Sequence, residues 1–196
     1  MKIESKVFLI LFTIGSLALL AGSWFHVIPF SITEDLGFIT GALTVYVEEY
    51  ARGLLDFKDG RCDYEDIEKI AYGHRASERA LARQANKILF SDTDLLTTTI
   101  WSNALFGTCP EWIYEAAEEI TYDLYLVTDI DVPWVDDNQR FFSEEKQRQD
   151  FLERCLQALE QRNRPYIMLS GTWEQRLSKA ISAVEAILHP EKIRQK

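Results

Sequence analysis

Cysteine and histidine are scarce in this sequence, which contains three of each among 196 residues. The cysteines, Cys62, Cys109 and Cys155, are widely spaced and form no Cys-x-x-Cys pair. This spacing disfavours a disulfide framework and a zinc site, because zinc needs several Cys or His ligands close together. Reduced thiols are typical of the cytosol, so we expect a cytoplasmic protein.

Positive charge is also limited, with 21 Lys and Arg against 31 Asp and Glu and a formal net charge of −10. An acidic surface repels the phosphate backbone of nucleic acids, so we expect no general nucleic-acid binding. A local pocket for a single nucleotide is compatible with this charge. The length fits one domain of ordinary size, and the sequence leaves the oligomeric state open.

Charged residues are absent from residues 7–30, a run long enough to span a bilayer. Three interpretations fit this run. It is a transmembrane helix, or residues 7–21 are the apolar part of a signal peptide, or residues 7–12 are a buried strand that leads into a packed helix. We therefore divide the chain into a hydrophobic N-terminal segment, residues 1–34, which could contact a membrane, and a domain of residues 35–196.

Strand-like and helix-like segments alternate along the rest of the chain. We predict strands at residues 42–47, 88–91, 122–128 and 165–170, and helices from Asp63 or Asp66, at 93–106, at 110–120, from Ser143 and from Thr172 to Leu188. No Asn-Gly hairpin signal occurs, so the crossovers should be helical and the sheet mostly parallel. This order predicts a three-layer α/β domain. His74 lies on the apolar stripe of the first helix, where we expect a core residue.

Two carboxylates follow the apolar segment at residues 88–91. Asp92 and Asp94 would lie at the carboxyl end of a strand, and in an open parallel sheet that end faces the ligand crevice. We therefore expect them near a phosphate-bound magnesium ion, for which carboxylate oxygens are suitable ligands. The alternative is that Asp92 only caps the helix that follows.

Polar clusters also follow two other predicted strands. Residues 48–53 combine acids, an aromatic side chain and an arginine, and the alternative for them is a solvated turn. Residues 129–140 contain four acids, Trp134 and Arg140. Their place after a strand suits a mobile lid over a nucleotide, with Arg140 able to reach a transferring phosphate. The alternative is an exposed loop in which Trp134 packs against the base of its own loop.

Four short motifs can be compared with a known family. They are Glu-Tyr-Ala-Arg at residues 49–52, Ser-Asp-Thr-Asp-Leu-Leu-Thr-Thr-Thr at 91–99, Val-Pro-Trp-Val-Asp-Asp at 132–137 and Arg-Pro-Tyr-Ile-Met-Leu-Ser-Gly at 164–171. In this order they resemble the ribosylnicotinamide kinase domain of NadR-type proteins, a P-loop kinase family, over residues 45–188. The resemblance implies a P-loop NTPase fold and a transferase that uses ATP and Mg²⁺ to phosphorylate nicotinamide riboside in NAD biosynthesis.

The resemblance also implies a role for each motif. Asp92 is similar to the acid that ends the Walker B strand and would bind magnesium, Asp94 lies beside it, and Arg140 is similar to the family's lid arginine. These three are the expected catalytic residues. The expected substrate-binding residues are Glu49, Tyr50, Arg52 and Trp134, and the expected nucleotide-binding residues are Gly171 and Arg176.

Two features depart from the family pattern. The phosphate-binding loop Gly-x-x-x-x-Gly-Lys-Ser/Thr is not found, and the only lysines before Lys58 are Lys2 and Lys6. Asn138 and Gln139 stand where the family commonly has Gly-Leu. We therefore expect an ATP-dependent nucleoside kinase with a degenerate phosphate loop. The alternative is a non-catalytic binding or anchoring relative, or a truncated gene product.

Overall fold

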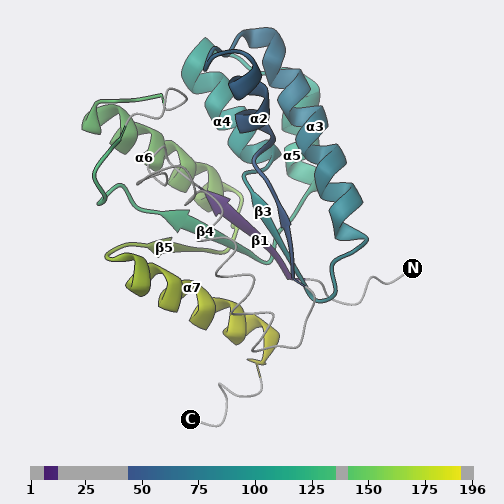
Figure 1. The fold of residues 1–196 in the computed structure, drawn as a ribbon, viewed down its shortest axis with the longest axis vertical. Coiled ribbons are helices and arrows are strands. Elements are labelled where there is room, and N and C mark those ends of the chain that lie inside the picture. The colour runs from purple at the N-terminus through teal and green to yellow at the C-terminus, as the bar shows by residue number, and fades with distance from the viewer. Residues whose placement is uncertain (1–6, 13–43, 136–140, 191–196) are drawn as a thin grey trace.

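The computed structural model describes residues 7–12, 44–135 and 141–190, and in them a single parallel sheet forms the centre (Figure 1). Its strands are β1 (Val7–Phe12), β2 (Thr44–Val47), β3 (Ile88–Asp92), β4 (Leu124–Thr128) and β5 (Tyr166–Leu169). Their spatial order is β2-β3-β1-β4-β5, and each neighbouring pair is parallel. The predicted parallel sheet is confirmed.

Strand β1 lies in the middle of this sheet. It pairs with β3 on one side, from Val7 opposite Ile88 to Leu11 opposite Asp92, and with β4 on the other. Of the three interpretations of the N-terminal apolar run, the structure shows the strand, and the rest of that run lies outside the described residues. Among the described residues no helix is long and apolar enough to cross a membrane, so the transmembrane helix is not supported.

Helices cover both faces of the sheet. They are α2 (Tyr50–Phe57), α3 (Tyr64–Ala82), α4 (Leu95–Phe106), α5 (Glu111–Glu119), α6 (Glu145–Gln161) and α7 (Trp173–Leu188). Figure 1 shows α7 on the face opposite to α3, α4, α5 and α6. The arrangement is the three-layer α/β architecture that the alternation of segments predicts.

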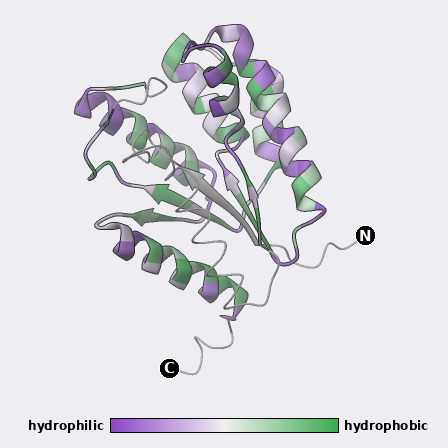
Figure 2. Cartoon of the chain, viewed as in Figure 1, coloured by the Kyte–Doolittle hydropathy of each residue, from purple (hydrophilic) through white to green (hydrophobic). Residues whose placement is uncertain are grey.

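The alternation of side chains along the strands separates two cores. Ile88 and Phe90 of β3 pack with Val184 and its neighbours on α7. Tyr125 and Val127 of β4 pack with α3, α4, α5 and α6 on the other face. In Figure 2 the strands β4 and β5 are mostly hydrophobic, whereas the helices alternate hydrophobic and hydrophilic residues. Helices such as α6 and α7 therefore cover the sheet with one apolar stripe, whereas α4 is buried around most of its circumference from Leu95 to Ile100.

Helix ends follow local sequence signals. Gly107, at a φ of 74°, ends α4 as predicted, because glycine adopts the left-handed conformation without steric cost. Thr172 and Gln175 form a capping box at the start of α7, where each side chain accepts a hydrogen bond from the other residue's backbone N–H. These signals are local, so sequence alone is sufficient to locate them.

Helix α2 is a described element that the sequence patterns missed. The composition of residues 48–53 predicts a polar cluster or a solvated turn, but Tyr50 begins an eight-residue helix with Glu49 as its N-terminal cap residue. The helix is short, and it contains Gly53, a poor helix former. It packs against α3 and buries Leu55. Tertiary packing therefore outweighs a weak local preference here.

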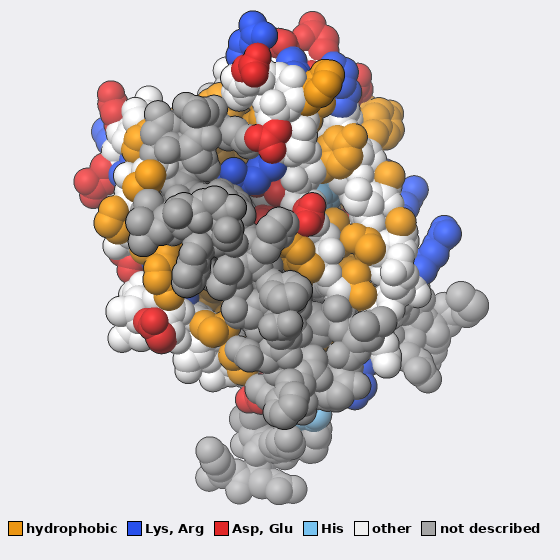
Figure 3. Space-filling view, in the orientation of Figure 1, with side chains coloured by type: hydrophobic (Ala, Val, Ile, Leu, Met, Phe, Trp, Pro, Cys, Tyr) orange, Lys and Arg blue, Asp and Glu red, His pale blue; other side chains and the backbone are white. Residues whose placement is uncertain are grey.

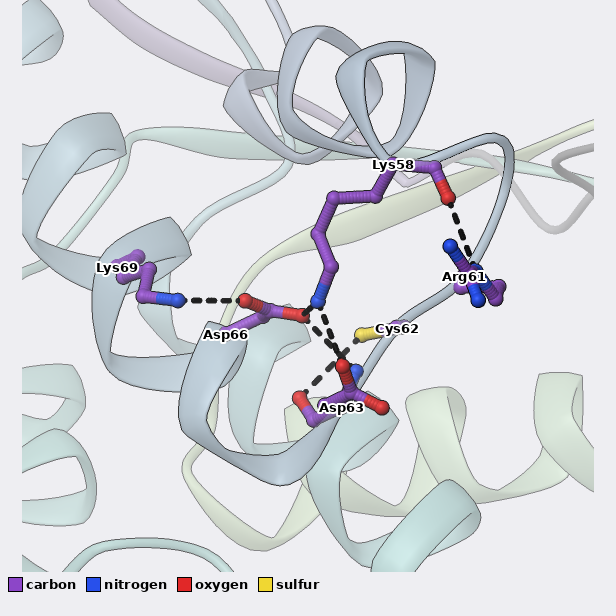
Figure 4. A network of polar contacts seen from close by, with 6 residues as sticks. All are labelled: Lys58, Arg61, Cys62, Asp63, Asp66 and Lys69. Carbon is purple, nitrogen blue, oxygen red and sulfur yellow. Dashed lines mark hydrogen bonds and ion pairs between the residues drawn. The ribbon is translucent and has the colours of Figure 1, made fainter.

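A charged cluster joins α2 to α3 (Figure 4). Lys58 Nζ lies 2.7 Å from Asp63 Oδ2 and also contacts the Asp66 carboxylate, to which Lys69 Nζ donates a hydrogen bond of 2.8 Å. Burial alone would raise the pKa of Asp66, but the hydrogen bonds from Lys58 and Lys69 outweigh it and lower the pKa below its usual range. The ammonium group of Lys58 is therefore engaged in holding the two helices together.

Candidate functional site

The carboxyl ends of β2 and β3 meet at one edge of the sheet. Val47 lies opposite Ser91, so the residues that follow Val47 begin beside Asp92. The Tyr46 hydroxyl donates a hydrogen bond of 2.8 Å to Asp92 Oδ2. Burial, and then the negative charge of Asp92, raise the pKa of Tyr46 far above its ordinary value, so the phenol stays protonated and can donate. This hydrogen bond thus connects Asp92 to β2, the strand that leads into the expected substrate residues.

Asp94 occupies a different environment from Asp92. It is 3% exposed and is the N-terminal cap residue of α4. Oδ1 accepts hydrogen bonds from the Thr97 backbone N–H at 2.7 Å and the Thr97 hydroxyl at 2.6 Å, and Oδ2 accepts one from the Tyr125 hydroxyl at 3.2 Å. Burial raises the pKa of Asp94. The helix cap is therefore Asp94 and not Asp92, and Asp94 lies in the interior instead of beside the expected magnesium ion.

Of the two carboxylates that follow β3, Asp92 is the one suited to a magnesium ion. Asp92 ends β3 and is half-buried, whereas both oxygens of Asp94 are used inside the fold. Mg²⁺ commonly binds one or two carboxylates and completes its shell with water and substrate phosphates. No group of three or more acidic, His or Cys side chains in the described ranges could hold a metal by itself. Asp92 therefore fits as a single protein ligand to a nucleotide-bound ion.

A cavity of about 590 Å³ opens beside β2 and α2. Tyr46, Glu48, Glu49 and Tyr50 supply polar groups to its wall, and Phe57 supplies an apolar one. Figure 3 shows hydrophobic side chains at the surface over α2 and α3, interspersed with acidic and basic ones. Ser77 and Leu81 of α3 also line the cavity, whereas Asp92 does not, so Tyr46 is the residue that connects the cavity to the end of β3.

The expected substrate residues lie together at the start of α2. The ring of Tyr50 rests over Gly73 of α3, where an added Cβ would lie 2.1 Å from Tyr50 Cζ. Tyr50 is 40% exposed, so one side of its ring stays open to solvent. Glu49 Oε2 and Arg52 Nε form an ion pair of 3.2 Å. The absence of a side chain at Gly73 therefore sets the position of the Tyr50 ring.

Gly171 and Arg176 lie beyond β5, on the other half of the sheet edge. Arg176 is buried, donates from Nε to the Gly171 carbonyl at 2.9 Å and pairs with the Asp131 carboxylate. Asp131 Oδ2 also accepts a 2.6 Å hydrogen bond from the Gly171 N–H. The Arg176 guanidinium lies 5.7 Å from the centre of the Trp173 ring. These contacts bind the loop after β4 to the loop after β5.

The expected lid residues are described in part. Trp134 is half-buried, and its indole N–H has no hydrogen-bond partner in the described part of the chain. Arg140 lies outside the described residues, so its role remains a prediction. Just beyond it, the Phe142 ring stacks on Trp101 at 5.3 Å, and Arg148 donates to the Phe142 carbonyl at 3.2 Å. The end of this loop is therefore anchored on α4 and α6.

Sequence reasoning missed Tyr46 and Asp131. Tyr46 was interpreted as an ordinary strand residue, although a buried tyrosine needs a partner for its hydroxyl. Alternation also places Tyr46 and Glu48 on one side of β2, a signal that they face the same region. Asp131 follows β4 and was counted only as a loop acid. Its contact with Arg176 joins residues 45 positions apart, and no local pattern indicates it.

Comparison with known proteins identifies the family and the fold. The family model AAA_28, described as an AAA domain, matches residues 35–176. The trifunctional NAD biosynthesis/regulator protein NadR of Escherichia coli strain K12 is 24% identical over 152 residues, which cover 77% of this chain and 37% of that protein. The protein of the same name from Salmonella typhimurium strain LT2 has the same identity and coverage. The chain thus spans little more than a third of these relatives.

Solved structures share the fold. A NadR protein in complex with NR has a TM-score of 0.62 at 22% identity, over 92% of this chain and 51% of that one. A NadR protein in complex with NAD and AMP-PNP has a TM-score of 0.58 at 20% identity, over 92% and 49%. Thymidylate kinase from Ehrlichia chaffeensis has a TM-score of 0.59 at 13% identity, over 94% and 100%. The chain therefore belongs to the AAA domain family and contains a NadR-like P-loop kinase domain.

Proposed function

We propose that this chain binds nicotinamide riboside at the joined ends of β2 and β3, as a ribosylnicotinamide kinase of NAD salvage or a relative derived from one. The observation that carries the proposal is the double role of Tyr46, which lines the cavity and holds Asp92. A nucleoside in the cavity would thus lie close to the carboxylate expected to bind magnesium. The NadR relatives and the NadR structure in complex with NR support this substrate class.

The chemistry of the cavity suits a cationic riboside. Glu48 and Glu49 supply carboxylate oxygens, which accept hydrogen bonds from ribose hydroxyls. The open face of Tyr50, or Trp134 from the loop after β4, can stack on a positively charged pyridine ring, a cation–π contact worth roughly 0.5–2 kcal/mol. Arg52 is paired with Glu49 and balances part of the negative charge.

ATP and Mg²⁺ complete the proposed reaction. Asp92 would hold the ion, Arg140 would contact the transferring phosphate, and the loop of Gly171 and Arg176 would lie near the adenine. The family match covers residues 35–176, and β1 of the N-terminal segment pairs with β3 and β4, so we place residues 7–12 in the same domain as the matched residues. Three cysteines without a disulfide support a cytoplasmic location.

The second candidate is a binding protein without catalysis. It rests on the sequence itself, which contains no Gly-Lys pair to provide the usual phosphate loop. Losing that lysine and its neighbouring hydroxyl would remove a charge partner and a magnesium ligand. The substrate side would then be retained while phosphoryl transfer is lost.

We expect the whole chain to bind nicotinamide riboside weakly but measurably in ligand-detected NMR. Trp134→Ala removes a cation–π contact worth roughly 0.5–2 kcal/mol, which weakens an already weak complex about 2- to 30-fold. Asp92→Asn removes the carboxylate at the end of β3, so the signal should fall or be lost in both variants. Asp123→Asn, at an exposed position before β4, should bind like the wild type. Absence of a riboside signal, or equal behaviour of the three variants, contradicts the proposal.

Gly73→Ala tests the same site without altering a polar group. The new Cβ would occupy the place of the Tyr50 ring and displace it from the cavity wall. The gain in helix propensity from glycine to alanine, about 1 kcal/mol, offsets the lost packing of the Tyr50 ring on α3, so the melting temperature should change little. Riboside binding should weaken in the same NMR assay, and unchanged binding would exclude Tyr50 from the site.

We expect ATP with Mg²⁺ to bind this chain poorly. Lys58 is engaged with Asp63 and Asp66, and the sequence offers only Lys2 and Lys6 before it. Isothermal titration calorimetry of the whole chain measures the affinity. Micromolar binding would contradict this prediction and favour an active kinase over the non-catalytic relative.

A further inference from the structure

The turn that follows β3 contains a backbone strain that the proposed chemistry does not explain. Thr93 lies between Asp92 and Asp94 and has a φ of 66°. This left-handed conformation is unfavourable for a β-branched residue. Such strain persists only where the surrounding structure imposes it, and it is frequent at functional sites. The question is what holds Thr93 in place.

Two buried side chains hold the turn from the α3 side. The Ser91 hydroxyl donates a 3.1 Å hydrogen bond to the Thr93 carbonyl. Its oxygen lies 3.1 Å from His74 Nε2, and because the hydroxyl proton is already used, Nε2 carries the proton and donates to Ser91. His74 is 2% exposed, and burial lowers its pKa to about 4, so the imidazole is neutral near pH 7. These hydrogen bonds connect His74 on α3, through Ser91 on β3, to Thr93.

The strain separates the two neighbouring carboxylates. Strand alternation directs Ser91 toward α3 and Asp92 toward the opposite face, where Tyr46 binds it. Asp94 turns into the interior and caps α4. Only one residue separates Asp92 from Asp94, so the left-handed Thr93 must supply the change in direction.

We propose that His74 and Ser91 are positioning residues that hold Thr93 in its left-handed conformation and thereby fix the Asp92 carboxylate at the ligand site. The proposal rests on the proposed riboside site for its functional consequence. Its structural part, the immobilisation of the Asp92 carboxylate, can be tested without a ligand. His74 therefore acts through Thr93 and Asp92 and is not itself placed against the substrate.

Substitutions at Thr93 separate positioning from stability. Thr93→Gly relieves the strain but frees the backbone, so the melting temperature should stay equal or rise by about 2 °C. Riboside affinity should nevertheless fall about two- to tenfold, because the turn after β3 is then free and no longer helps the Tyr46 hydrogen bond to hold the Asp92 carboxylate in place. Thr93→Asn also tolerates the left-handed conformation but keeps the chain stiffer, so it should retain binding.

Substitutions at His74 test the hydrogen bond between His74 and Ser91. His74→Leu removes the donor to Ser91 and should weaken riboside binding about two- to tenfold. His74→Gln offers an amide N–H to Ser91 and should restore most of the affinity. If affinity is unchanged in Thr93→Gly and His74→Leu, or falls only in proportion to melting temperature, the proposal is overturned.

A measurement without ligand makes the two proposals distinguishable. The ¹³C resonance of the Asp92 carboxyl should be single and sharp in the wild type and in Thr93→Asn. It should broaden or split in Thr93→Gly and in His74→Leu, because the carboxylate would sample several positions. A wild type that fails to bind riboside but shows this pattern refutes the proposed function and supports the positioning role. Identical carboxyl resonances in all four proteins refute the positioning role.

Discussion

A chain that begins at residue 35 should fail to fold, although it retains every residue matched by the family. Such a chain lacks β1, which pairs with both β3 and β4. Without it, β2-β3 and β4-β5 would be two separate pairs, each with an unpaired edge in the middle of the domain. A buried backbone group without a hydrogen bond costs about 1–3 kcal/mol. Several such groups exceed the roughly 5–15 kcal/mol that stabilises a typical domain.

Circular dichroism and thermal unfolding measure this effect. The shortened chain should show no cooperative transition, whereas a chain that lacks only residues 1–6 keeps β1 and should unfold like the full protein. A cooperative transition in the chain of residues 35–196 would show that β1 is dispensable. Ligand-binding measurements should therefore use the whole chain.

Asp94→Ala should lower the free energy of unfolding by roughly 2–4 kcal/mol. Loss of a helix N-cap costs about 1 kcal/mol, and the buried partners Thr97 and Tyr125 left without an acceptor cost about 1–3 kcal/mol more. For a domain of this size the melting temperature should fall by about 5–15 °C. Differential scanning calorimetry measures the change.

Two control variants identify the cause. Asp94→Asn keeps an oxygen that can cap α4 and removes a buried charge, so its loss should be clearly smaller. Burial raises the pKa of Asp94, which means that ionisation above this pKa costs stability in the folded state, and the neutral amide avoids that cost. Glu115→Ala changes an exposed acid on α5 and should alter stability by less than about 0.5 kcal/mol. Equal losses in all three variants would refute the capping role.

Much of this fold could be predicted from local sequence. The strands β3, β4 and β5 lie within or close to the predicted segments because short apolar or β-branched runs form buried strands. The helices from Tyr64 and Trp173 follow their apolar stripes, and Gly107 ends α4. These features depend on residues a few positions apart, so one sequence contains the whole signal.

The tertiary structure decided the features that depend on distant partners. The run at residues 7–12 is compatible with a helix or a strand until β3 and β4 pair with it. Helix α2 has only eight residues and contains Gly53, so its local preference is weak until it packs against α3. Local periodicity does not indicate which long-range contacts will compensate for a weak local preference.

At the candidate site, the carboxylates at the end of β3 also combine a feature that the sequence predicts with a feature that only the tertiary structure decides. The sequence by itself determined that two acids follow a buried strand, and the alternation of strands and helices determined which edge of the sheet they reach. The structure decided that Asp92 faces Tyr46 while Asp94 caps α4, because their partners lie 46, 3 and 31 positions away. The physical reason is that a side chain's direction and protonation depend on the groups the fold packs around it, and most of these groups are distant in the sequence.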